Sequence, residues 1–145
     1  MSDSTNPPQS APRRSPTDSS YYDCDGVVAN KNYPSSKSWH YARDVRAQVA
    51  AEQPQHPRGW RYPSYFGDKA GLPLAASKPL THTPIEPGSL TPYVPGTKPG
   101  AHRAVYNDTN RAVVDVIYHD PNKLPKNGSK FEEFSKATYV AKAVP

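Results

Sequence analysis

The sequence lacks most of what a disulfide scaffold, a zinc protein or a membrane protein needs. Cys24 is the single cysteine among 145 residues, so no disulfide can form within the chain. No Cys-x-x-Cys pair or His/Cys cluster suggests zinc, and no apolar run approaches the length of a membrane span. Residues 1–20 contain no apolar segment typical of a signal peptide. We predict no metal, no cofactor and no membrane contact, and either an intracellular protein or one whose signal was removed.

Hydrophobic residues are also scarce, at 34%, whereas proline is abundant, with 18 residues. The chain nevertheless has 10 tyrosines, 2 tryptophans and 3 phenylalanines. Disordered chains are poor in aromatic residues, so the composition favours a small folded core in a loop-rich chain. The net charge of +5 is a mild basic excess. It suits a polyanionic partner and equally well serves solubility.

The N-terminal segment differs from the rest of the chain. Residues 1–20 are rich in serine and proline and have no aromatic or branched aliphatic side chain. Nothing there can be buried to offset the loss of chain entropy. We predict a disordered tail at residues 1–20 and one domain at residues 21–145, which we expect to be a monomer.

One helix is predicted after a short hairpin. Residues 21–29 (YYDCDGVVA) suggest a hairpin that turns at Asp25-Gly26. A helix capped by Ser36 or Ser38 is then expected to run toward Pro54. Its apolar positions recur at helical spacing and are Trp39, Ala42, Val45 and Val49.

The remainder predicts antiparallel strands. Residues 58–66 are strand-like, and residues 80–86 form a short run in which Pro84 implies an edge strand or a bulge. Residues 102–107 and 112–119 predict a hairpin, and residues 137–144 a closing strand after a polar excursion. The order predicts an α+β fold, with one helix packed on a four- to five-stranded antiparallel sheet.

Three stretches carry a recognisable pattern. Tyr62-Pro63 begins a strand and precedes an aromatic pair; residues 99–107 read PGAHRAVYN; residues 116–119 read VIYH. In this order they resemble the microbial guanyl-specific ribonucleases and the related fungal ribotoxins, from about Tyr22 to Val140. The resemblance implies RNA as the partner and a secreted protein, whereas the single cysteine also permits an intracellular one.

The resemblance implies cleavage of RNA by transesterification, with the RNA's own 2′-hydroxyl as nucleophile. It places His119 as the acid that protonates the leaving oxygen and Arg103 as the phosphate clamp. His82 stands at the position of the base. An imidazole with the reference pKa of about 6.5 is a competent base near neutral pH and is blocked by its proton below it. Glu86, two alternations further along, is a second candidate base.

Four aromatic residues are candidates for holding the substrate. The resemblance implies that the Tyr62 hydroxyl donates to a phosphate oxygen. Tyr65, Phe66 and Tyr139 can stack on a base, and Tyr139 stands where the family has its closing aromatic residue. For each of the four, packing in the core is the alternative.

The sequence also departs from the family. Ser64 replaces a usual histidine, His82 replaces the glutamate base, and Ala70 replaces the guanine-binding glutamate. The cysteine that would pair with Cys24 is missing near Lys142. Similar losses occur in ribonuclease-like effectors of plant-pathogenic fungi, many of which keep the fold without the catalysis.

Three functions therefore stay open. The chain is a ribonuclease with relaxed base preference, a catalytically silent relative that binds RNA or a host protein, or an adaptor whose proline-rich segments dock on partners. In the non-catalytic cases Arg103 is a surface residue paired with a carboxylate such as Asp108 or Asp115, His82 is solvated, and His119 enters a loop without a role. Convergence of His82, Arg103 and His119 on one site favours the ribonuclease.

Overall fold

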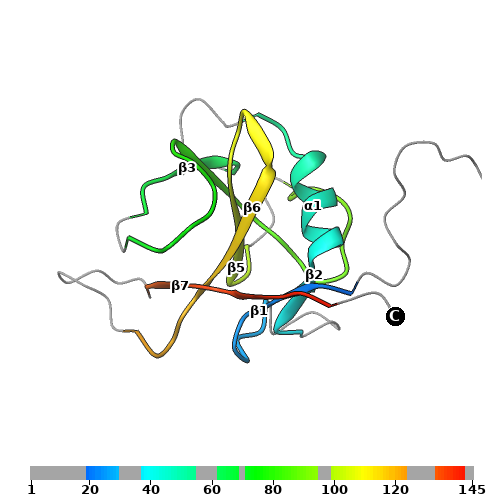
Figure 1. Cartoon of the computed structure of the whole chain (residues 1–145), viewed down its shortest axis with the longest axis vertical. Coiled ribbons are helices and arrows are strands. Elements are labelled where there is room, and N and C mark those ends of the chain that lie inside the picture. Colours follow the sequence, from blue (N-terminus) through cyan, green and yellow to red (C-terminus); the bar gives the residue numbers. More distant parts are fainter. Residues whose placement is uncertain are drawn as a thin grey trace, which may run out of the picture.

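The described residues form one helix and eight strands in two antiparallel sheets (Figure 1). This confirms the predicted α+β class. The computed structural model describes residues 19–29, 37–54, 62–68, 71–94, 99–123 and 133–142. The predicted tail lies outside these residues except for its last two. Within the described part of the chain, no helix is long and apolar enough to cross a membrane.

The smaller sheet joins three short strands, β1 (Tyr21–Asp23), β2 (Trp39–Tyr41) and β8 (Thr138–Val140), in the order β2-β1-β8. The chain turns at Asp25-Gly26, as predicted, because both residues have positive φ angles of 53° and 80°. The predicted hairpin within residues 21–29 is wrong, however. β1 pairs instead with β2, and beyond the turn the Ala29 carbonyl accepts a hydrogen bond from the Ala101 N–H at 2.8 Å.

The helix α1 (Ala42–Ala50) begins later than the sequence predicts, because residues 39–41 form β2. The alternation of Trp39, His40 and Tyr41 suits a strand that buries only its middle residue, and His40 is fully buried. A serine cap is therefore not used, and the N-cap Tyr41 makes no side-chain capping bond. Three of the four predicted apolar positions are buried against the sheet, namely Ala42, Val45 and Val49.

The larger sheet has the order β3-β4-β5-β6-β7, so each strand pairs with its neighbours in sequence. Its strands are β3 (Ser64–Phe66), β4 (Leu80–Pro84), β5 (His102–Asn107), β6 (Asn110–His119) and β7 (Phe134–Lys136). The predicted β5/β6 hairpin is confirmed. β4 is not an edge strand, because it lies between β3 and β5. Pro84 is tolerated as its last residue, beyond the final pair that joins β4 to β3.

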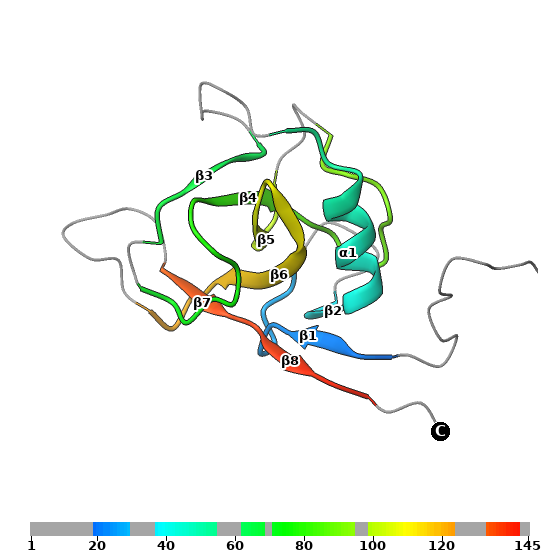
Figure 2. The same ribbon diagram turned by 45° about the horizontal axis from the view of Figure 1, so that its top comes forward.

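The C-terminal region forms two short strands where one was predicted. β7 pairs with β6 and β8 pairs with β1, so the two strands extend different sheets. The buried Ala137 lies between them and donates its N–H to the Val116 carbonyl at 2.8 Å. Figure 2 shows this C-terminal segment running from the larger sheet to the smaller one.

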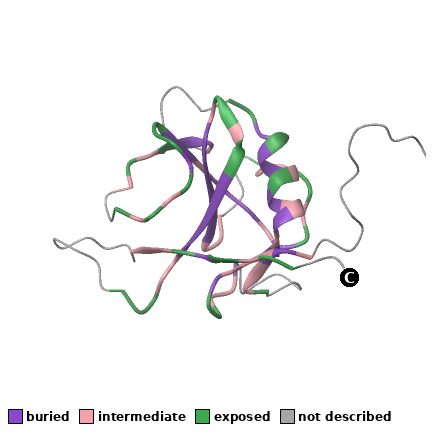
Figure 3. Cartoon of the chain, in the orientation of Figure 1, coloured by how far each residue is buried: buried purple, intermediate pink, exposed green. Residues whose placement is uncertain are grey.

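Two apolar clusters cover the two faces of the larger sheet. The cluster between this sheet and α1 includes Val45, Val49, Ile85, Ala104, Tyr106, Val114, Val116 and Tyr118. A smaller cluster on the other face includes Leu80, Val105 and Ile117, with Phe66 and Phe134 packed against it. Figure 3 shows the resulting burial along β5 and much of β6. β5 is buried at every residue, so its side chains are held firmly on both faces.

Polar contacts from α1 fix the chain just beyond β4. Gln48 Oε1 accepts the Glu86 N–H at 3.2 Å, and Gln48 Nε2 donates to the Glu86 carbonyl at 3.4 Å. Glu52 accepts the Thr83 hydroxyl at 3.1 Å and the Tyr93 N–H at 3.3 Å. These carboxylate and amide contacts hold the end of β4 and the residues after it against α1 and the residues that follow the helix.

Candidate active site

The face of the larger sheet that points away from α1 carries the predicted catalytic residues. Side chains alternate along a strand. Ala104 and Tyr118 pack on the helix side, so their neighbours Arg103 and His119 point the other way. Both residues lie close enough to His82 to lower its pKa. The structure thus brings His82, Arg103 and His119 together on three adjacent strands.

Arg103 is a buried cation that makes no direct ion pair with a carboxylate among the described residues, although Glu86 lies near enough to interact with it electrostatically. Arg103 is 4% exposed, and none of the ion pairs between described residues includes it. Nη1 donates to the Gly100 carbonyl and to the His102 carbonyl, the latter at 3.0 Å. Nε is buried and has no hydrogen-bond partner within the described residues. Burying an unpaired charge is costly, so this guanidinium is suited to receive an anion.

The two aspartates named as alternative partners of Arg103 are engaged elsewhere. Asp108 pairs with Arg111 at 2.6 Å. Asp115 accepts the backbone N–H groups of Ala75 and Ala76 at 3.1 and 2.9 Å. The interpretation of Arg103 as a surface residue paired with one of these two aspartates is therefore wrong.

His82 is held in an aromatic setting and stays neutral. Its ring lies 5.2 Å from the Tyr62 ring and 5.1 Å from the Phe66 ring, centroid to centroid. Burial, followed by the charges of Arg103 and His119, lowers the pKa of His82 to about 3. Nδ1 is buried without a hydrogen-bond partner among the described residues. This lowered pKa places protonation of the ring well below pH 6.5, the value at which the reference pKa predicts a block by a proton.

His119 ends β6 beside an aromatic residue that the sequence did not single out. The register pairs His119 with Phe134 on β7, and the two rings lie 4.1 Å apart at 32°. The ring centroids of Phe134 and Phe66 lie 5.9 Å apart. The signal for Phe134 was weak, because it follows a long polar segment and begins a strand of only three residues.

Tyr62 lies next to both Arg103 and His82. Arg103 Nη2 donates to the Tyr62 hydroxyl at 3.4 Å, and Arg103 Cζ lies 5.2 Å from the centroid of the Tyr62 ring. The phenol ring therefore contacts the cation while its hydroxyl lies at the edge of the cluster. This is the position from which a phenol can donate to a bound phosphate.

Glu86 lies beside Arg103, and hydrogen bonds from the Gln48 side chain hold the Glu86 backbone in place. Burial raises the pKa of its carboxyl, and Arg103 opposes that rise. The carboxyl approaches Gly100, where a Cβ would lie 3.5 Å from Glu86 Oε2 and would overlap the Ala29 carbonyl. Only glycine fits there, and its carbonyl in turn holds Arg103. This explains the Pro-Gly at the start of the second sequence stretch.

Two of the aromatic candidates lie away from this cluster. Tyr65 is 61% exposed and alternates with Ser64 and Phe66, which turns it to the other side of β3. Tyr139 lies on β8 in the smaller sheet and contacts Tyr22 at 5.3 Å. The structure therefore groups only Tyr62 and Phe66, of the four, with His82.

Two further histidines lie on the helix side of β5. His102 lies on β5, and burial lowers its pKa to about 4. His40 lies on β2 and is fully buried against His102. Together with Cys24, they form the one group of His, Cys or acidic residues with metal-ligand spacing in the part of the chain described.

Comparison with known protein families finds a match that covers most of the chain. The ribonuclease family model matches residues 15–135, which is most of the chain. The matched segment includes His82, Arg103, His119 and Phe134, and it ends before Tyr139. No curated protein sequence matches the chain.

Proposed function

The chain belongs to the ribonuclease family, and we propose that it cleaves RNA by metal-independent transesterification at His82, Arg103 and His119. The observation that carries the proposal is the buried guanidinium of Arg103. It forms no direct ion pair among the described residues, although Glu86 lies beside it, and it lies between two imidazoles on the same face of the sheet. A phosphodiester is the anion that such a group accepts, because the planar guanidinium matches phosphate oxygens.

The proposed step needs one base and one acid. Neutral His82 takes the proton of the RNA 2′-hydroxyl as its oxygen attacks the adjacent phosphorus. The bond between phosphorus and O2′ forms while the bond to O5′ breaks, and protonated His119 donates its proton to the leaving O5′. The products are a 2′,3′-cyclic phosphate and a 5′-hydroxyl, so no oxidant, reductant or water is consumed.

Arg103 and Tyr62 stabilise the negative charge that gathers on phosphorus. A fixed cation in a buried site interacts more strongly with developing charge than a solvated one does. The Gly100 and His102 carbonyls hold Nη1, so the guanidinium needs little rearrangement when the phosphate arrives. Tyr62 contributes its hydroxyl from the opposite edge of the guanidinium.

We propose a relaxed base preference. Phe66 and Phe134 form an aromatic pair beside the two histidines, and base–aromatic stacking recognises any base. The position of the family's guanine-binding glutamate is occupied by Ala70, which lies outside the described residues. Stacking without a carboxylate for the guanine edge favours cleavage after several bases.

The experiment incubates purified protein with single-stranded and hairpin RNA in excess EDTA and determines the ends of the fragments. The proposal expects fragments with 2′,3′-cyclic phosphate and 5′-hydroxyl ends after more than one kind of base. The matched control is the His119→Ala protein, purified identically, which excludes a contaminating nuclease. RNA binding without any cyclic phosphate between pH 4 and 9 would overturn catalysis and leave a silent relative that binds RNA.

A further inference from the structure

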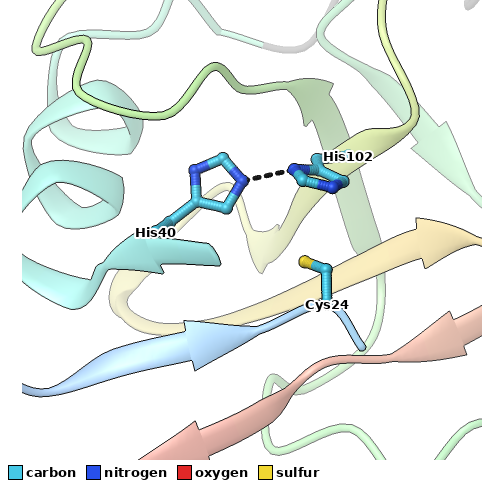
Figure 4. A group of neighbouring side chains, drawn as sticks. All are labelled: Cys24, His40 and His102. Atoms are coloured by element: carbon cyan, nitrogen blue, oxygen red, sulfur yellow. Dashed lines mark hydrogen bonds between the residues drawn. The ribbon is translucent and has the colours of Figure 1, made fainter. Parts of the chain in front are cut away.

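A second cluster of chemically reactive side chains lies on the opposite side of β5 from the proposed RNA site. Cys24, His40 and His102 are each 0% exposed, and one potential ligand atom from each lies within 4.8 Å of the other two. Figure 4 shows the thiol and the two imidazoles pointing toward one another. They come from the end of β1, from β2 and from β5, so the cluster connects the two sheets.

Hydrogen bonds fix which nitrogen of His102 is available. His102 Nε2 lies 2.7 Å from the Val27 carbonyl, which can only accept, so Nε2 carries the proton. His102 Nδ1 therefore presents a lone pair to His40 Nε2, 2.6 Å away. A histidine that donates one ring N–H to a backbone carbonyl and presents the other nitrogen is oriented like a metal ligand.

Both imidazoles are fully buried, and an imidazole binds metal through its neutral ring. His40 Nδ1 is buried and has no hydrogen-bond partner within the described chain. That nitrogen can hold the His40 proton if Nε2 binds an ion, so the ring can change its tautomer without becoming charged.

We propose that Cys24, His40 and His102 form a three-coordinate binding site for a soft monovalent metal ion, Cu(I). A thiolate with two imidazoles is a donor set that soft ions favour. One thiolate neutralises one positive charge, so a Cu(I) complex is neutral whereas a Zn²⁺ complex leaves a net charge in a fully buried place. Arg103, adjacent in the chain, is already a buried cation without a direct ion pair among the described residues and disfavours that further charge.

Binding requires two proton shifts and a small opening of the cluster. The Cys24 thiol loses its proton to solvent, and the His40 proton moves from Nε2 to Nδ1, which breaks the bond between the histidines. Ligand atoms about 2.0–2.3 Å from an ion lie roughly 3.3–3.8 Å from one another. The two nitrogens must therefore separate somewhat from 2.6 Å, while the 4.8 Å limit keeps the sulfur within reach.

The test titrates the full chain with Cu(I) under anaerobic conditions against a Cu(I)-selective chelator, with Zn²⁺ in a parallel arm. The proposal expects one Cu(I) per chain, X-ray absorption with one sulfur and two nitrogen ligands, and a Tm rise of about 5 °C or more. Cys24→Ser should lower Cu(I) affinity at least about 100-fold. The matched control is His82→Ala, which removes a histidine from the other face and should bind one Cu(I) as before.

Three results would overturn the proposal. The first is no retention of Cu(I) by the wild-type chain, which needs no variant to interpret. The second is a bound ion without sulfur in its coordination shell, and the third is Zn²⁺ bound as tightly as Cu(I). None of these concerns RNA, so the cleavage assay in EDTA tests the proposed function separately.

Discussion

The guanidinium of Arg103 lies against the phenol of Tyr62, with Cζ 5.2 Å from the ring centroid and Nη2 3.4 Å from the hydroxyl oxygen. A cation over an aromatic face is attracted to it, but the ring does not neutralise the charge. Backbone carbonyls accept the remaining hydrogen bonds from Nη1. The cation is therefore fixed in position and keeps its charge, which is the requirement for a phosphate clamp.

Arg103→Ala should reduce cleavage by at least about 100-fold, as expected for the loss of a fixed group that stabilises transition-state charge. RNA binding should weaken as well. The slope of log affinity against log salt concentration should become smaller by the contribution of about one phosphate contact. The matched control is Arg43→Ala on α1, a partly exposed arginine against Tyr41. If the RNA affinity and the salt slope of the Arg103→Ala protein equal those of the wild type, Arg103 does not lie in the RNA site.

The pH dependence of kcat/KM should lack an acid limb near pH 6.5. Because the pKa of His82 is lowered to about 3, the base remains available as the pH falls from 7 to 5. Activity per folded molecule should therefore stay high in that interval, with folding monitored by circular dichroism. A half-maximal rate at about pH 6.5, the reference value, would mean that His82 is solvated. Cleavage that survives His82→Ala and disappears in Glu86→Ala would assign the base to Glu86.

The stability of the fold should decrease as the pH falls from 6.5 toward 4.5. His40, His82 and His102 have lowered pKa values in the folded chain, whereas the unfolded chain binds protons near pH 6.5. Between these two pH limits the unfolded state holds more protons than the folded state, so the free energy of unfolding decreases as the pH is lowered. The loss is at most about 1.4 kcal/mol per pH unit for each histidine. A Tm that stays constant from pH 6.5 to 4.5 would contradict the burial of these rings.

Phe134→Ala should weaken substrate binding, while Tyr139→Ala should leave cleavage nearly unchanged. Phe134 contacts His119 at 4.1 Å, whereas Tyr139 lies in the other sheet. Loss of one stacked base costs about 1–3 kcal/mol, equivalent to a roughly 5- to 150-fold rise in KM. Steady-state kinetics of the two variants decide between the aromatic residues. A larger rise in KM for Tyr139→Ala than for Phe134→Ala would instead support Tyr139 as the residue that stacks on a base, as the sequence suggested.

The longer secondary-structure elements could be predicted from the sequence, whereas the shortest strands could not. The β5/β6 hairpin was predicted because it has many alternations and a clear turn. Residues 39–41 were read as helix because Trp39 continues the apolar spacing of Ala42 and Val45. A strand of three residues offers too few alternations to outweigh that spacing, and the same brevity concealed β7 and Phe134.

The sequence predicted which residues are candidates for the site but not their electrostatics. The ordered motifs singled out His82, Arg103 and His119 as candidates, and the register places these three on neighbouring strands. The lowered pKa of His82 depends on aromatic residues and a cation supplied by other strands. The Cys24–His40–His102 cluster was equally invisible, because its members are far apart in sequence and meet only when the two sheets pack.

The most direct measurement uses a DNA oligonucleotide that contains a single ribonucleotide, incubated with the protein in excess EDTA. Transesterification requires the 2′-hydroxyl next to the broken bond, so cleavage should occur only on the 3′ side of that ribonucleotide. The 5′ fragment should carry a 2′,3′-cyclic phosphate, and the all-DNA oligonucleotide should remain intact. Cleavage of the all-DNA strand, or an intact single-ribonucleotide strand under conditions where the protein binds it, would contradict the assignment of His82, Arg103 and His119 as a transesterification site.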